Sequence, residues 1–171
     1  MTRATALLLA AFCGASPVLA QTPAGTAATA IESDAIGIAM EGVPYPFLVN
    51  FLPLEVEKQA CRLAYMDVQP SQPNGRTVVL FHGKNFYGSY WEATARALSE
   101  NGYRVVIPDQ IGFGKSSKPI IGYTFTLLAD HTAQLLDHLG IREAAVVGHS
   151  MGGMVAVRFT LHHPKRVTKL G

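Results

Sequence analysis

The sequence contains little cysteine, little net charge and no long hydrophobic run beyond its first residues. Only two of its 171 residues are cysteines, Cys13 and Cys61, so a disulfide scaffold is excluded. The 14 lysines and arginines exceed the 12 aspartates and glutamates by two, which gives nucleic acid or an anionic membrane no electrostatic footprint. Hydrophobic residues make up 49% and charged residues 15%, which excludes a disordered chain and allows one globular domain with its own core.

The first 20 residues are typical of a cleaved signal peptide. Arg3 supplies a positive start, residues 7–12 form a short apolar run, and residues 18–20 match a small-residue cleavage site. A membrane anchor is the alternative, but spanning needs about 20 apolar residues and a glycine and a proline interrupt this run. We therefore expect a periplasmic or secreted protein without a membrane segment after cleavage. Its single remaining thiol, Cys61, is expected to be buried, and a catalytic role for it is the weaker alternative.

Residues 21–43 are rich in Ala, Thr and Gly and predict a flexible mature N-terminus, so residues 44–171 carry the folded domain. Residues 44–68 are interrupted by prolines and predict two edge strands. Continuous runs of β-forming apolar residues then predict strands buried on both faces, at 77–81, 104–107 and 144–147.

Helical spacing of apolar residues follows each of these three strands. Trp91, Ala95 and Leu98 recur at i, i+4 and i+7, and further helices are predicted over about 128–139 and 154–162. Alternating strands and helices predict an α/β fold, with a parallel sheet covered by helices on both faces. Ligands bind such sheets beyond the carboxyl ends of the strands.

The three strand ends therefore carry the candidate site residues. The last end contains Gly148-His149-Ser150-Met151-Gly152, a G-x-S-x-G nucleophile elbow in which a sharp turn exposes the serine hydroxyl. The two glycines are needed because a Cβ there would clash with neighbouring backbone. An ordinary structural turn with an N-cap serine also fits the pentapeptide, but the strand before it, the helix after it and His82-Gly83 at an earlier strand end favour the elbow.

From about residue 77 to residue 169 the sequence resembles the N-terminal part of an α/β-hydrolase. The resemblance implies that Ser150 is the nucleophile and that the backbone N–H groups of Lys84 and Met151 form the oxyanion hole. The loop from Asp109 to Ser116 would shape the site without reacting. Epoxide hydrolases and haloalkane dehalogenases share these flanking motifs but use Asp as nucleophile. Ser150 therefore implies an esterase, a lipase, a C–C bond hydrolase or an iminopeptidase acting on a small molecule.

Other functions fit the same residues less well. Gly114-Lys115-Ser116 mimics the end of a P-loop, but that motif needs Gly at position 109, where Asp109 would repel phosphate. A dinucleotide fingerprint would need Gly where Ser117 stands. His162-His163 lacks a third metal ligand, so neither a metal nor a cofactor is expected.

Several aromatic residues and histidines are expected to have structural roles. His149 is interpreted as a structural neighbour of the nucleophile and His82 as a hydrogen-bonded scaffold residue. His131 and His138 are predicted to be solvated. Three aromatic residues are predicted to pack helix against sheet rather than to bind substrate: Tyr87, Tyr90 and Trp91.

The partners that an activated serine requires are missing from the sequence after Ser150. No Asp or Glu follows it, and the only histidines are His162 and His163. Twelve residues of helix would place His162 about 18 Å away. We therefore expect a hydrolase truncated after the nucleophile helix, with little or no turnover by this chain. A non-catalytic remnant or fragment of such a hydrolase is the alternative.

Overall fold

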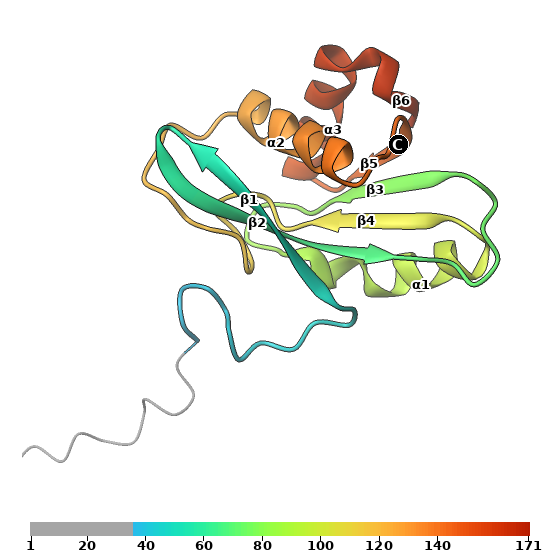
Figure 1. Cartoon of the computed structure of the whole chain (residues 1–171), viewed down its shortest axis with the longest axis horizontal. Helices are drawn as coiled ribbons and strands as arrows, with labels where there is room; N and C mark the ends of the chain where they lie inside the picture. Colours follow the sequence, from blue (N-terminus) through green and yellow to red (C-terminus); the bar gives the residue numbers. More distant parts are fainter. Residues whose placement is uncertain (1–35) are drawn as a thin grey trace, which may run out of the picture. The chain divides into compact units, whose positions relative to one another are not determined.

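A six-stranded sheet in the order β1-β2-β4-β3-β5-β6 organises residues 36–171, the part of the chain that this computed structural model describes (Figure 1). The strands are β1 (Val49–Val56), β2 (Gln59–Val68), β3 (Thr77–Phe81), β4 (Arg104–Pro108), β5 (Ala144–Gly148) and β6 (Val167–Leu170). The predicted signal peptide and most of the predicted flexible segment lie outside the described residues. They stay predictions, as does the periplasmic or secreted location.

The sheet is parallel over four strands and antiparallel at one side. β4, β3, β5 and β6 run parallel, whereas β1 and β2 form an antiparallel hairpin whose second strand pairs antiparallel with β4. The predicted α/β class with a mostly parallel sheet is confirmed. The prediction of two edge strands is wrong for β2, because Tyr65 pairs with Pro108 and Val68 pairs with Val105, which places β2 inside the sheet.

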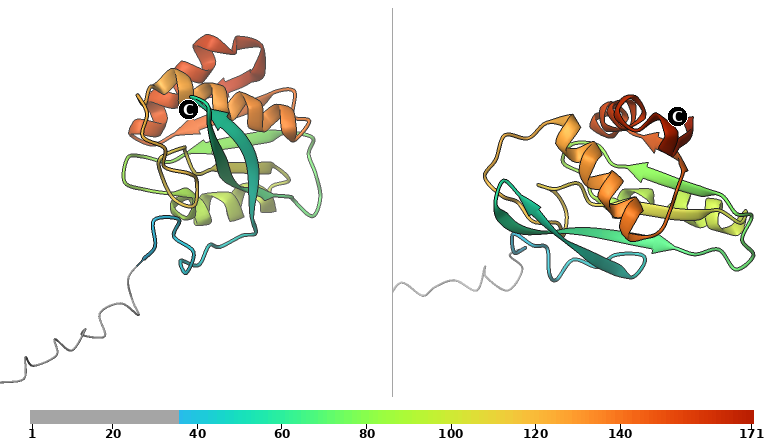
Figure 2. Two further views of the ribbon diagram at one scale, coloured as in Figure 1. Left: turned by 60° about the vertical axis from the view of Figure 1, so that its left-hand side comes forward. Right: turned by 45° about the horizontal axis from the view of Figure 1, so that its top comes forward.

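Helices cover both faces of the sheet, as predicted. α1 (Glu92–Glu100) lies on one face, and α2 (Phe125–His138) and α3 (Met151–His162) lie together on the other (Figure 2). Each face has its own core, with Phe81, Leu135 and Phe159 under α2 and α3, and Leu80, Ala95 and Ile107 under α1. A short 3-10 turn, Gly88–Trp91, precedes α1, and another, Pro164–Arg166, follows α3. None of the helices in residues 36–171 has the length and apolar character needed to cross a bilayer.

Two predictions about burial are wrong. Cys61 is only half-buried, because the part of β2 that pairs with β1 alone has little packed over it, and Ala60 beside it is exposed. His131 is 6% exposed rather than solvated, since it follows Leu128 by three positions on the face of α2 that meets the sheet. This burial lowers the pKa of the His131 imidazole.

Candidate active site

The turn between β5 and α3 places Ser150 in a conformation that few residues other than glycine adopt. Its backbone has φ 55° and ψ −119°, and its side chain is exposed. Ser150 occupies the N-cap position of α3, yet its hydroxyl makes no capping hydrogen bond to the helix. An ordinary N-cap serine uses its oxygen for that bond. The Ser150 hydroxyl is therefore left free at the carboxyl end of the sheet.

Two glycines allow this turn to form against the neighbouring strand. A Cβ on Gly148 would overlap the backbone of Gly152, and a Cβ on Gly152 would overlap the carbonyl group of Phe81. The N–H of His149 donates to the Phe81 carbonyl oxygen at 3.1 Å, which ties the turn to the end of β3. The position of Ser150 is thus fixed by backbone contacts that leave no room for side chains.

The loop after β3 is held by a fully buried histidine. The N–H of Gln110 donates to His82 Nε2 at 2.9 Å, so Nδ1 carries the proton and donates to the Gly83 carbonyl oxygen at 2.9 Å. Burial lowers the pKa of His82, which favours the neutral ring that this arrangement requires. His82 therefore links two strand-end loops and has no nitrogen free to act as a base.

This loop lies directly beside the serine. A Cβ built on Gly83 would lie 3.4 Å from the Ser150 Cβ and 3.0 Å from His149 Nδ1. Lys84 follows Gly83, and Met151 follows Ser150. Within the described residues, the backbone N–H groups of Lys84 and Met151 donate no hydrogen bond. Each of the two residues that follow this contact, Lys84 and Met151, therefore has a free amide donor.

Asp109 anchors the loop after β4. Its carboxylate is 1% exposed and accepts hydrogen bonds from the Gly88 N–H at 2.6 Å, the Lys115 N–H at 2.7 Å and the Tyr45 hydroxyl at 2.6 Å. Burial and the bond to Asp109 raise the pKa of Tyr45, which keeps the phenol protonated as the donor. A Cβ on Gly114 would overlap the Asp109 carboxylate, so this loop packs against the acid only with glycine at position 114.

Aromatic residues form one side of the serine turn. Tyr90 stacks on His149 with ring centroids 5.1 Å apart, and the Phe86 ring meets both of them edge-on. Trp91 packs into the core under α1, in line with its predicted role, whereas Tyr90 is 46% exposed and lies against the elbow. The sequence reasoning missed Phe86 and Tyr45, neither of which belongs to a recognisable motif.

A pocket of about 530 Å³ opens next to the serine turn, on the side of α2. Met151, the residue after Ser150, is part of its wall. Aromatic and aliphatic side chains from the loop after β4 and from α2 provide half of the remainder: Phe113, Tyr123, Phe125 and Leu128. Such a pocket can hold an apolar part of a small molecule.

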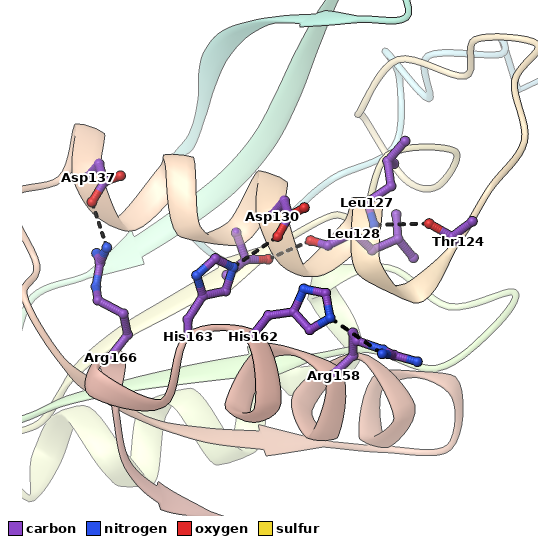
Figure 3. A network of polar contacts seen from close by, with 10 residues as sticks. Thr124, Leu127, Leu128, Asp130, Asp137, Arg158, His162, His163 and Arg166 are labelled. Atoms are coloured by element: carbon purple, nitrogen blue, oxygen red, sulfur yellow. Dashed lines mark hydrogen bonds and ion pairs between the residues drawn. The ribbon is translucent and has the colours of Figure 1, made fainter.

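The histidines at the far end of α3 contact other groups. His163 pairs with Asp130 at 2.9 Å, and His162 lies 3.4 Å from an Arg158 nitrogen (Figure 3). Met151–His162 spans 12 residues, so these rings lie about 18 Å along the helix from the serine. Within residues 36–171 the one His–carboxylate pair is therefore remote from Ser150. In the same residues no cluster of three His, Cys, Asp or Glu is placed to hold a metal ion.

Comparison with known proteins identifies the family. The family pattern described as "alpha/beta hydrolase fold" matches residues 76–170. The chain belongs to this family. A solved structure described as a probable hydrolytic enzyme from Pseudomonas aeruginosa PAO1 is 47% identical, with a TM-score of 0.77 over 78% of this chain and 43% of that one.

Curated relatives of this α/β-hydrolase chain have different activities. It is 38% identical over 99 residues to a protein provisionally named carbamate hydrolase RutD from Serratia proteamaculans, covering 57% of this chain and 37% of the relative. It is 29% identical over 129 residues to a haloalkane dehalogenase from Mycolicibacterium paratuberculosis, covering 74% of this chain and 42% of the relative. The chain thus spans about two fifths of the length of these relatives.

Proposed function

We propose that the protein is a serine hydrolase that cleaves an ester-like bond in a small molecule, with Ser150 as nucleophile. The observation that carries this proposal is the free, exposed hydroxyl of Ser150 on a strained turn, beside a loop with an unbonded amide. The amides of Lys84 and Met151 would hold the negative charge that develops on the carbonyl oxygen. Membership of a hydrolase family supports the reaction class.

The proposed reaction is acyl transfer in two steps. The Ser150 oxygen forms a bond to the carbonyl carbon, the bond to the leaving group breaks, and the serine proton passes through a base to the leaving group. Water then attacks the acyl-serine ester, which releases the acid and restores the hydroxyl. Both tetrahedral intermediates place a negative oxygen where the two amides can donate to it.

A serine nucleophile also limits which of the relatives' reactions this chain could catalyse. A carboxylate nucleophile that displaces a halide forms an ester, which water can hydrolyse. A serine that displaced a halide would form an alkyl ether, which water does not cleave. The enzyme would therefore stay alkylated after a single turnover. Ser150 therefore favours acyl substrates over haloalkanes, although a haloalkane dehalogenase is among the relatives. Carboxylic esters fit best, with amides and C–C bonds as further acyl substrates.

We further propose that the general base and its orienting acid correspond to residues that the relatives have C-terminal to the segment aligned with this chain. His82 is held at both nitrogens, and His162 and His163 lie at the other end of α3. Without a base, a serine in an oxyanion hole retains only residual reactivity. The 171-residue chain is expected to react selectively at Ser150 but to turn over slowly.

Labelling with a fluorophosphonate tests the nucleophile. Ser150 is expected to displace fluoride from phosphorus, and peptide mapping by mass spectrometry should find the adduct at Ser150 in preference to other serines. A chimera that joins residues 36–171 to the remaining C-terminal portion of the Pseudomonas aeruginosa protein should label about a thousandfold faster, since a triad adds that much or more.

Matched variants decide the outcome. Ser150→Ala should abolish the adduct in both chains, whereas Ser99→Ala in α1 should leave it unchanged. Equal labelling of the Ser150→Ala variant, or no labelling of the chimera, would overturn the proposal. The second result would favour a remnant that keeps the scaffold without its chemistry.

A further inference from the structure

The pocket next to the serine turn is lined by polar and charged residues as well as apolar ones. Thr124, Thr126 and Arg158 contribute to its surface together with Met151 and the aromatic side chains. Thr124 is the N-cap of α2, and its hydroxyl accepts from the Leu127 N–H at 3.1 Å. Arg158 is thus the charged group that could bind a ligand in this pocket.

The Arg158 guanidinium is not neutralised by the protein. It is exposed, and among the described residues it forms no ion pair with a carboxylate. Its one hydrogen bond is long, 3.4 Å to the imidazole of His162. Asp130, the nearby acid on α2, pairs with His163 instead (Figure 3). A cation in this state retains donors and charge for an anionic ligand.

The position of Arg158 sets its distance from the reacting bond. Met151 and Arg158 are separated by seven residues of α3, which is about 10 Å along the helix axis. Helical side chains tilt toward the N-terminus, so the long Arg158 side chain reaches back toward Ser150. Figure 3 shows this side chain between α2 and α3, on the side of Thr124. Phe113, Phe125 and Met151 line the same pocket as Arg158.

We infer that Arg158 makes this site selective for acyl groups that end in an anion, such as half-esters of dicarboxylic acids. This inference rests on the proposed function, because it assumes that the bond to be cleaved lies at Ser150. The apolar body of the acyl group would lie against Phe113, Phe125 and Met151, and its terminal carboxylate would bind Arg158. Neutral acyl groups of the same length would lose that ion pair.

Two fluorophosphonates with the same hexyl chain test this inference on the 171-residue chain. One probe ends in a carboxylate and the other in a primary carboxamide, which has the same shape without the charge. The carboxylate probe is expected to label Ser150 about tenfold faster, the gain of one hydrogen bond to a charged group. Arg158→Gln should bring the ratio of the two labelling rates close to one, and Arg158→Lys should retain part of the preference. Added salt should weaken the preference, since it screens an exposed pair.

Arg142→Gln is the matched control, because Arg142 is also exposed but precedes β5, at the opposite end of that strand from Ser150. It should leave the ratio unchanged. Equal labelling by the two probes in the unmodified chain, or a preference that survives Arg158→Gln, would overturn the selectivity and leave the nucleophile standing. Absence of an adduct at Ser150 with either probe would instead overturn the proposed function, and this inference with it.

Discussion

At Ser150 a residue with a side chain holds a backbone conformation that suits glycine. Such conformations cost about 1–3 kcal/mol and persist only where surrounding contacts impose them. Here the contacts are backbone ones, from Gly148 and Gly152 to each other and to Phe81. The same conformation turns the hydroxyl away from the first turn of α3 and so prevents it from capping the helix. The cost to stability and the free hydroxyl of Ser150 therefore have one cause.

This strain predicts an unusual order of stability at position 150. Ser150→Gly should be more stable than Ser150→Ala by about 1 kcal/mol, because glycine adopts a positive φ without steric cost. Urea unfolding monitored by circular dichroism measures both variants. At Ser99, inside α1, the order should reverse, since glycine is the poorer helix former by about 1 kcal/mol. A Ser150→Ala variant at least as stable as Ser150→Gly would show that the turn at Ser150 is not strained.

At the residue scale, the sequence predicted contacts that lie within motifs and missed those that join distant segments. The exposed hydroxyl of Ser150 and the need for glycine at 148 and 152 follow from the local turn. The hydrogen bond from Tyr45 to Asp109 joins residues 64 positions apart, and no local pattern marks Tyr45 as its donor. The roles of Ser150, Lys84 and Met151 in catalysis stay predictions until they are tested.

At the scale of elements, α3 approaches the sheet closely at its first turn. Gly152 faces the end of β3, where a Cβ would overlap the Phe81 carbonyl group. Gly153, the next residue, faces outward, and a Cβ there would lie no closer than 3.7 Å to its nearest neighbour, the Gly148 oxygen. Two adjacent glycines in one helix thus have different surroundings, and only the first is required by packing.

Alanine at each of these glycines should therefore have opposite effects. Gly152→Ala should destabilise the fold by about 3 kcal/mol, since α3 and β3 must separate to admit a methyl group. Gly153→Ala should stabilise it by up to about 1 kcal/mol through helix propensity. Thermal unfolding of the two variants under identical conditions makes the comparison. A Gly152→Ala variant as stable as the Gly153→Ala variant would mean that the helix start is not as closely packed as described.

Most of the elements could be predicted because the sheet is buried. A strand covered on both faces needs a continuous apolar run, and the runs at 77–81, 104–107 and 144–147 became β3, β4 and β5. The β1–β2 hairpin was harder to predict, because prolines and polar residues interrupt the hydrophobic pattern of its strands. Its place in the sheet also depends on pairing with β4. β2 is an internal strand because it pairs with β4, which is distant in the sequence. The spacing of apolar residues within β2 does not show this pairing.

At the scale of the whole molecule, one side of the described fold is apolar and open. Met154, Val157 and Leu161 recur along the outer face of α3, and Leu161 is 68% exposed. β6 lies at the edge of the sheet, with Leu170 exposed. Soluble monomers rarely present a contiguous apolar surface together with an unpaired strand edge, since each favours association.

The 171-residue chain is therefore expected to self-associate at micromolar concentration. Size-exclusion chromatography with light scattering over a dilution series should show a mass that rises with concentration. Replacing Val157 and Leu161 together by Glu should shift the chain toward monomer, because two charges on adjacent turns of α3 oppose burial of that face. Gln134→Glu, which adds charge on the exposed side of α2, should leave association unchanged. A monomeric unmodified chain, or an equal effect of Gln134→Glu, would show that the outer face of α3 does not drive the contact.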